Sequence, residues 1–188
     1  GYVGFALDVY GKGVLGSSVE ENTRLMTPFM EDRNHLQERL TVAYETLKQQ
    51  PQVEASNIAA IGYCFGGLCV LDMVRSGLAL AGVASFHGIL KPSSQQKNNA
   101  PSKSKVLILH GDKDPMVAFD DLQQCRAELA KLGCDWRMHI YSQALHAFTN
   151  PDANDPKLGT VYNKQADAHS SLLLWDFLRE LFDVPSSE

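Results

Sequence analysis

The stretch "IAAIGYCFGGLCVLD", residues 58 to 72, constrains the fold more than any other part of the chain. It joins a strand-like apolar run to a helix-like one through Cys64, which lies between Gly62 and Gly66. A nucleophile on a sharp strand-to-helix turn needs nearly side-chain-free residues at these two positions. The alternative is a buried cysteine without chemical function, because cysteine is among the most buried residue types. The choice depends on whether the rest of the chain supplies partners for a nucleophile.

Strand-like and helix-like segments alternate along the whole chain. Short apolar runs typical of buried parallel strands are followed by segments with apolar residues at three- and four-residue spacing. This alternation predicts an α/β fold with a doubly wound, mostly parallel sheet, in one domain spanning residues 1–188. The expected elements are strands at 2–7, up to 62, 80–88, 105–111 and 135–141, helices at about 29–50, 65–75, 119–132 and 162–182, and an exposed polar loop at 92–105.

Charge and composition exclude several classes of function. The formal net charge is −5 and no Lys/Arg-rich block occurs, which argues against a nucleic-acid partner. The longest apolar runs fall far short of a membrane span. The four cysteines show no zinc-ligand spacing and are interpreted as reduced thiols in a cytoplasmic protein. We therefore expect no metal, no cofactor, and a monomer or small homo-oligomer that binds a small molecule.

Partners for Cys64 are expected later in the chain, in the order acid and then base. His146 follows the last expected strand and is the candidate base, which takes the thiol proton and later returns one to the leaving group. Two carboxylates compete to orient its imidazole. Asp112 is well explained as a turn residue after a glycine, whereas Asp114 lies further into the loop and is preferred. The Phe65 N–H is expected to form one half of an oxyanion hole.

Three motifs in this order, "GYCFGG", "HGDKDPMV" and "LHAFTNP", resemble those of the dienelactone hydrolase family of the α/β-hydrolase superfamily, over essentially the whole chain. The resemblance implies a triad of Cys64, Asp114 and His146 that hydrolyses small carboxylic esters or lactones through an acyl-thioester intermediate. The type reaction of the family opens an enol-lactone to a keto acid. A catalytically inactive scaffold used for binding and a thioesterase with the same triad remain as alternatives.

The chain departs from the family pattern in two ways. Family members begin with further strands before the one that matches residues 2–7, and a loop there supplies a second oxyanion donor and a glutamate that pairs with the thiol. Neither occurs in these 188 residues, so we expect this chain alone to be poorly soluble and nearly inactive. Asn150 stands where characterised members carry a carboxylate-binding arginine, which favours a broader esterase or lactonase. Arg24 or Arg33 is a candidate to replace that arginine.

Substrate contacts are expected from residues that neighbour the triad in the sequence or that end a strand. His87 ends the expected strand at 80–88 and is a candidate to line the cleft. The full set of expected substrate-binding residues is Tyr63, His87, Phe148 and Asn150.

Overall fold

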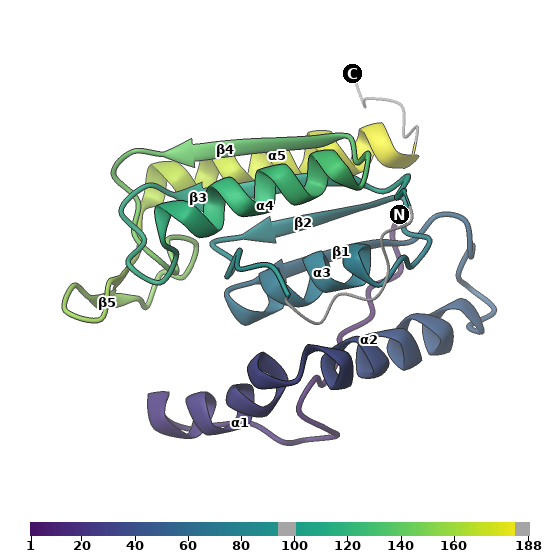
Figure 1. Cartoon of the computed structure of the whole chain (residues 1–188), viewed down its shortest axis with the longest axis horizontal. Coiled ribbons are helices and arrows are strands. Elements are labelled where there is room, and N and C mark those ends of the chain that lie inside the picture. The colour runs from purple at the N-terminus through teal and green to yellow at the C-terminus, as the bar shows by residue number, and fades with distance from the viewer. Residues whose placement is uncertain (94–100, 183–188) are drawn as a thin grey trace.

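The structure, a computed structural model, describes residues 1–93 and 101–182 of the chain (Figure 1). Its centre is a four-stranded sheet in the order β1-β2-β3-β4, and every neighbouring pair is parallel. The carboxyl ends of these strands therefore meet at one edge of the sheet, on the left in Figure 1. The strands are β1 (Ala59–Tyr63), β2 (Gly82–Phe86), β3 (Lys105–Gly111) and β4 (Trp136–Tyr141).

Helices cover both faces of the sheet, as the expected doubly wound α/β fold requires. α3 and α4 lie on one face, with α2 packed against α3, and α5 lies on the other (Figure 1). The helices are α1 (Val19–Glu31), α2 (Arg33–Lys48), α3 (Phe65–Arg75), α4 (Phe119–Lys131) and α5 (Lys164–Phe182). This agrees with the prediction of an α/β fold from the alternating sequence pattern.

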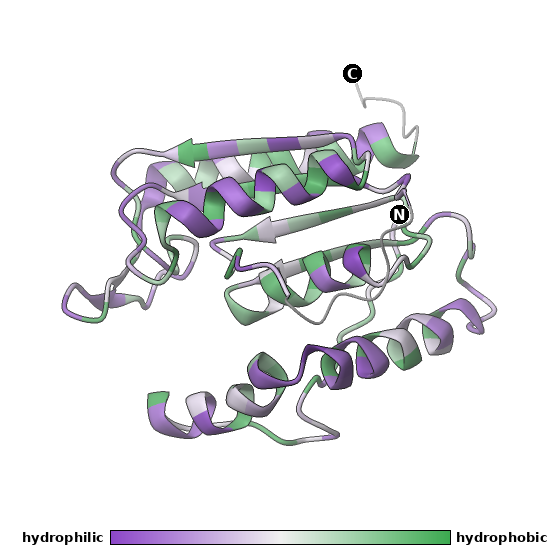
Figure 2. Ribbon diagram, viewed as in Figure 1, coloured by the Kyte–Doolittle hydropathy of each residue, from purple (hydrophilic) through white to green (hydrophobic). Residues whose placement is uncertain are grey.

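Side-chain alternation along the strands divides the core into two apolar clusters. On β2, Val83 belongs to the cluster under α2, α3 and α4, and its neighbour Ala84 belongs to the cluster under α5. The central strands read as continuous apolar runs because both of their faces are buried. Figure 2 shows hydrophilic and hydrophobic residues alternating along α2 and α4, as expected of helices with one apolar face. In the described part of the chain, no helix is both long and apolar enough to cross a membrane.

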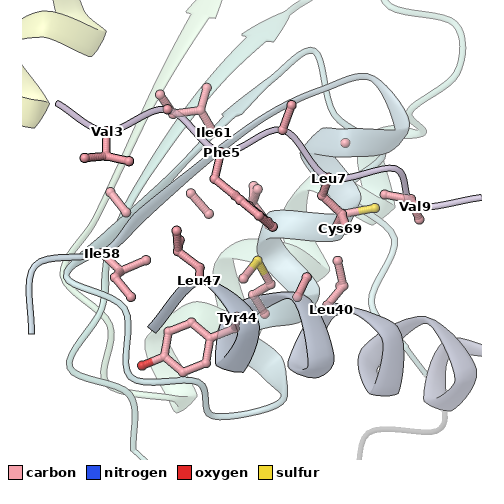
Figure 3. Close-up of a pocket in the computed structure, with 18 residues that line it drawn as sticks. Val3, Phe5, Leu7, Val9, Leu40, Tyr44, Leu47, Ile58, Ile61 and Cys69 are labelled. Atoms are coloured by element: carbon pink, nitrogen blue, oxygen red, sulfur yellow. The ribbon is translucent and has the colours of Figure 1, made fainter. Parts of the chain in front are cut away.

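The strand expected at residues 2–7 is not formed, and this prediction is wrong. The segment carries no strand assignment and its residues are exposed. It lies beside the edge strand β1, and a cavity of about 410 Å³ opens between the two, walled on a third side by α2 and α3 (Figure 3). Val3, Phe5 and Leu7 line this cavity together with Ile58 and Ile61. The apolar side chains of the segment thus line the cavity, but its backbone lacks the ladder hydrogen bonds that define a strand.

Two further expectations need correction. The helix expected at 29–50 is α2 preceded by the end of α1, which begins earlier, at Val19, and was not expected. The two helices are separate because Asp32 has an extended backbone and its Oδ1 accepts the N–H groups of Asn34 and His35, each at 3.1 Å. This cap starts α2 and so separates it from α1. The apolar pattern did not indicate α1, because Phe29 is the one buried residue of that helix. A short antiparallel pair, β5 (Asn154–Asp155) with β6 (Thr160–Val161), was also not expected. Much of the loop expected at 92–105 lies outside the described residues.

Candidate active site

The nucleophile candidate lies on a strained turn between β1 and α3. Cys64 has φ 53° and ψ −117°, outside the regions that most residues occupy. A Cβ on Gly62 would lie 1.9 Å from the Gly66 oxygen, and one on Gly67 would lie 2.6 Å from the Gly88 Cα. These two positions therefore exclude a side chain. Gly66 does not, since no atom would lie within 4 Å of its Cβ, which corrects the expectation for that position.

Free N–H groups of the α3 N-terminus lie next to this turn. The first bond of the helix is donated by the Gly67 N–H to the Cys64 oxygen, at 3.0 Å. The N–H groups of Phe65 and Gly66 come before it, and such groups have no partner within the helix. They carry the positive end of the helix dipole. The start of α3 therefore provides the kind of donor that stabilises an oxyanion formed beside Cys64.

Three side chains from separate strand ends meet at this turn. His146 Nε2 lies 3.0 Å from Cys64 Sγ, and His146 Nδ1 lies 2.8 Å from Asp114 Oδ2. The Asp114 carboxylate can only accept, so Nδ1 carries a hydrogen and donates it. The other carboxylate oxygen of Asp114 accepts the Met116 N–H at 2.9 Å. Asp112, the rejected alternative, is exposed at the end of β3.

The burial and pairing of His146 control its charge. Burial alone lowers the pKa of this imidazole, but hydrogen bonds to Asp114 and Cys64 outweigh it and raise the pKa to about 9. His146 is 2% exposed and Asp114 is 5% exposed. At neutral pH the imidazole is therefore charged, and its Nε2–H donates to the sulfur of Cys64.

The other cysteines lack such surroundings. All four are free thiols, but Cys69, Cys125 and Cys134 are buried while Cys64 is partly exposed. Burial raises the pKa of Cys69 to about 12 and that of Cys125 to about 11, and it also raises the pKa of Cys134. Since the thiolate is the reactive form, these three thiols are poor nucleophiles.

The expected substrate contacts differ in their placement. Tyr63 is 48% exposed, and its ring stacks on that of Phe86. His87 and Phe148 are only 3% and 0% exposed, and their rings pack against each other. The His87 ring also contacts that of His146. Asn150 is exposed and its Oδ1 accepts the Asp152 N–H at 3.0 Å, an ordinary turn-forming contact.

The two arginines considered for carboxylate binding also differ. Arg33 is buried, and its guanidinium pairs with Asp72 of α3. Asp72 in turn pairs with Arg75, whose guanidinium also reaches Glu128 on α4. Arg33 is therefore part of a buried ion-pair network that joins the helices, and it does not serve as a replacement. Arg24 is exposed on α1.

The cavity of Figure 3 does not include the triad residues. It is lined by Gly66 and Cys69 of α3, but not by Cys64, Asp114 or His146. Among the described residues, no group of three or more possible metal-binding side chains occurs.

Comparison with known proteins shows to which family the chain belongs. The sequence profile of the Dienelactone hydrolase family matches residues 1–182. The chain belongs to this family. An uncharacterized protein of Caenorhabditis elegans, K02A2.1, is 32% identical over 154 residues, which cover 80% of this chain and 98% of that protein. A protein of Aquifex aeolicus, a carboxymethylenebutenolidase by name only, is 27% identical over 84% of this chain and 69% of its own length.

Solved structures of hydrolases share the fold of this chain. The dienelactone hydrolase-like promiscuous phosphotriesterase P91, from metagenomic libraries, superposes with a TM-score of 0.86 at 30% identity, over 94% of this chain and 73% of that chain. The carboxylesterase of Bacillus cereus superposes with a TM-score of 0.59 at 17% identity, over 80% of this chain and 64% of that chain. The second likeness is one of fold alone.

Proposed function

We propose that the protein is a cysteine-dependent hydrolase of small carboxylic esters or lactones. The observation that supports this most directly is the pair of contacts made by one imidazole, 3.0 Å to Cys64 Sγ and 2.8 Å to Asp114 Oδ2. Nucleophile, base and orienting acid are thus in hydrogen-bond contact, which is the arrangement that nucleophilic catalysis needs. Membership of the dienelactone hydrolase family supports the reaction class.

Acylation begins with attack of the Cys64 thiolate on the carbonyl carbon. The carbonyl oxygen gains a negative charge, and the Phe65 N–H at the start of α3 is the donor that stabilises it. The tetrahedral intermediate then collapses, and the bond to the leaving oxygen breaks. That oxygen takes the proton of His146 Nε2. The products are a thioester on Cys64 and an alcohol, which in a lactone stays joined to the acyl group.

Deacylation returns the enzyme to its starting state. The neutral His146 removes a proton from water, and the resulting hydroxide attacks the thioester carbonyl. Collapse of this second intermediate releases the carboxylic acid and leaves the thiolate beside the imidazolium. Asp114 keeps Nδ1 protonated throughout, so Nε2 remains free to exchange the proton.

The substrate class follows from the charges near the site. Asn150 offers a neutral amide that already accepts a backbone N–H, and Arg33 is engaged with Asp72. Bidentate binding of a buried carboxylate calls for a guanidinium. We therefore expect a preference for small, weakly charged acyl groups, such that kcat/KM for a neutral ester equals or exceeds that for a carboxylate-bearing lactone of similar size.

Hydrolysis of p-nitrophenyl acetate by the wild type and by the Cys64→Ala variant tests the proposal. The wild type should acetylate Cys64, as peptide mapping of the quenched reaction detects, and should then release acetate at the low rate expected of this chain alone. Cys64→Ala should lose both the burst of p-nitrophenol and the adduct. Cys134→Ala is the matched control, because it removes a buried thiol of raised pKa and should keep the activity.

The outcomes separate the alternatives. Wild-type turnover by Cys64→Ala contradicts the mechanism. Absence of any acetyl adduct on Cys64 in the wild type favours an inactive scaffold. Much faster cleavage of a thioester than of the matching oxygen ester favours a thioesterase.

A further inference from the structure

Backbone strain concentrates at the candidate site. Within the described residues, three that are not glycine have positive φ: Cys64 at 53°, His87 at 36° and Ala147 at 56°. Cys64 is the proposed nucleophile, and Ala147 directly follows the proposed base. His87 has no role in the reaction as described. Such strained conformations persist only where the surroundings impose them, so the surroundings of His87 require an explanation.

The backbone around His87 is fixed to the nucleophile turn. The oxygen of Phe86 accepts the Cys64 N–H at 3.1 Å, and the His87 N–H donates to the Leu109 oxygen at 2.8 Å. The peptide unit between Phe86 and His87 therefore joins the turn at Cys64 to the neighbouring strand β3. A shift of the His87 backbone would therefore move the Phe86 oxygen, which accepts the Cys64 N–H.

The side chain of His87 reaches the opposite part of the site. Its Nε2 lies 2.9 Å from Thr149 Oγ1, three residues after the base. The ring centroid lies 5.2 Å from that of His146 and 5.1 Å from that of Phe148. Its Nδ1 is buried, and no side chain or backbone group of the described residues is within hydrogen-bond geometry of it. A buried polar atom in that state destabilises the fold, so this residue carries a second energetic cost besides its φ.

His87 is a neutral side chain next to a charged one. Burial, followed by the nearby charge of His146, lowers the pKa of His87 to about 4. The carboxylate of Asp114 acts in the opposite direction, and His110 adds to the lowering. A neutral ring can lie against the His146 imidazolium without repelling it, whereas a second imidazolium could not.

We propose that His87 is a positioning residue, which holds the His146 imidazole against Cys64 Sγ through its ring contact and its hydrogen bond to Thr149. Asp114 holds only one end of that imidazole, at Nδ1. The backbone of His146 is fixed by bonds to Gly159 and Val161, but these bonds do not fix the direction of Nε2. The His87 ring flanks the imidazole and limits its rotation. This positioning role rests on the proposed function, because it assumes that Cys64 is the nucleophile.

Substitution of Thr149 tests the proposal without removing either ring. Thr149→Val keeps the branched shape but removes the hydroxyl, so His87 Nε2 loses its hydrogen-bond partner. We expect the acetylation rate with p-nitrophenyl acetate to fall about 10- to 100-fold, because misplacement by about 1 Å can cost about 10²-fold. KM should change much less. Thr149→Ser restores the hydroxyl and should recover most of the rate.

Alkylation of Cys64 by iodoacetamide at pH 6 gives a readout that needs no turnover. A displaced His146 no longer contacts Cys64 Sγ, so Thr149→Val should be alkylated about tenfold more slowly than Thr149→Ser. A purely structural hydrogen bond would lower the melting temperature and leave both rates of the folded protein unchanged.

Each outcome decides something specific. Equal rates for Thr149→Val and Thr149→Ser, or a loss that only follows the unfolded fraction, would overturn the role of His87. A wild type that forms no acetyl adduct on Cys64, combined with slow alkylation of Thr149→Val, would overturn the proposed function and support the positioning role. Ester turnover by the wild type, combined with equal alkylation rates of Thr149→Val and Thr149→Ser, would support the proposed function and overturn the positioning role.

Discussion

Replacement of Asp114 by asparagine should impair the reaction far more than the same change at Asp112. The carboxylate of Asp114 accepts two N–H groups, from His146 Nδ1 at 2.8 Å and from Met116 at 2.9 Å. Asparagine has a single acceptor oxygen for these two donors. If that oxygen keeps the Met116 N–H, the amide N–H₂ faces Nδ1 and holds His146 in the tautomer with the proton on Nε2. That tautomer cannot act as the base in deacylation.

The size of the loss can be bounded. In serine triads the corresponding change costs about 10⁴ in kcat, and a thiol depends less on its base because it ionises more readily. We therefore expect a loss on the order of 10²–10³ in kcat for Asp114→Asn. The pKa of His146 should also fall from about 9 towards its ordinary value of 6.5, since one of its two supporting hydrogen bonds disappears.

Stopped-flow kinetics with p-nitrophenyl acetate separates acylation from deacylation and measures both losses. Asp112→Asn is the matched control, because it removes the same charge from an exposed turn two residues away and should leave kcat within about threefold. Equal losses in the two variants, or a larger loss for Asp112→Asn, would refute the reasoning.

Three further predictions concern pH and association. Acylation by the wild type should decline as pH rises through about 9, where His146 loses the proton that the leaving group needs; a plateau to pH 11 would contradict this. Glu180→Gln should lower the free energy of unfolding by about 1 kcal/mol at pH 7, as measured by urea denaturation. Arg137 and then Lys105 lower the Glu180 pKa to about 2, so this difference should be present above the unfolded pKa of about 4.3 and vanish as pH falls through about 2. Phe5, 46% exposed beside the edge strand, should promote self-association, so sedimentation velocity should show less association for Phe5→Lys, whereas a monodisperse wild type would contradict this.

The local pattern of the sequence was enough to predict α3 and the turn before it. The helix expected at 65–75 is α3 with the same bounds, and the strand expected at 105–111 is β3. Both are short segments whose composition, periodicity and flanking glycines agree. The distant pairing of Cys64 with His146 was also expected, because parallel strands bring their carboxyl ends to one edge and the site residues lie just beyond those ends.

The role of His87 left no comparable signal in the sequence. Its burial, its positive φ and its bond to Thr149 depend on how the end of β2 meets the loop after β4, which are 62 residues apart in the chain. A histidine at a strand end has the same sequence pattern whether it lines a cleft or lies behind the base. Phe148 shows the same limit, since its full burial depends on the rings of His87 and Tyr141.

The segment at residues 2–7 shows why an apolar pattern alone does not establish a strand. The pattern describes where side chains can be buried, whereas a strand also needs a neighbour whose N–H and C=O groups match its own. Here the side chains of Val3 and Phe5 turn to the same cavity as Ile61, yet all three remain 42% exposed or more. The contacts of Cys64 and Asp114 with His146 do not depend on the pairing of this segment, because these side chains lie at strand ends whose positions are set by the parallel order of β1 to β4.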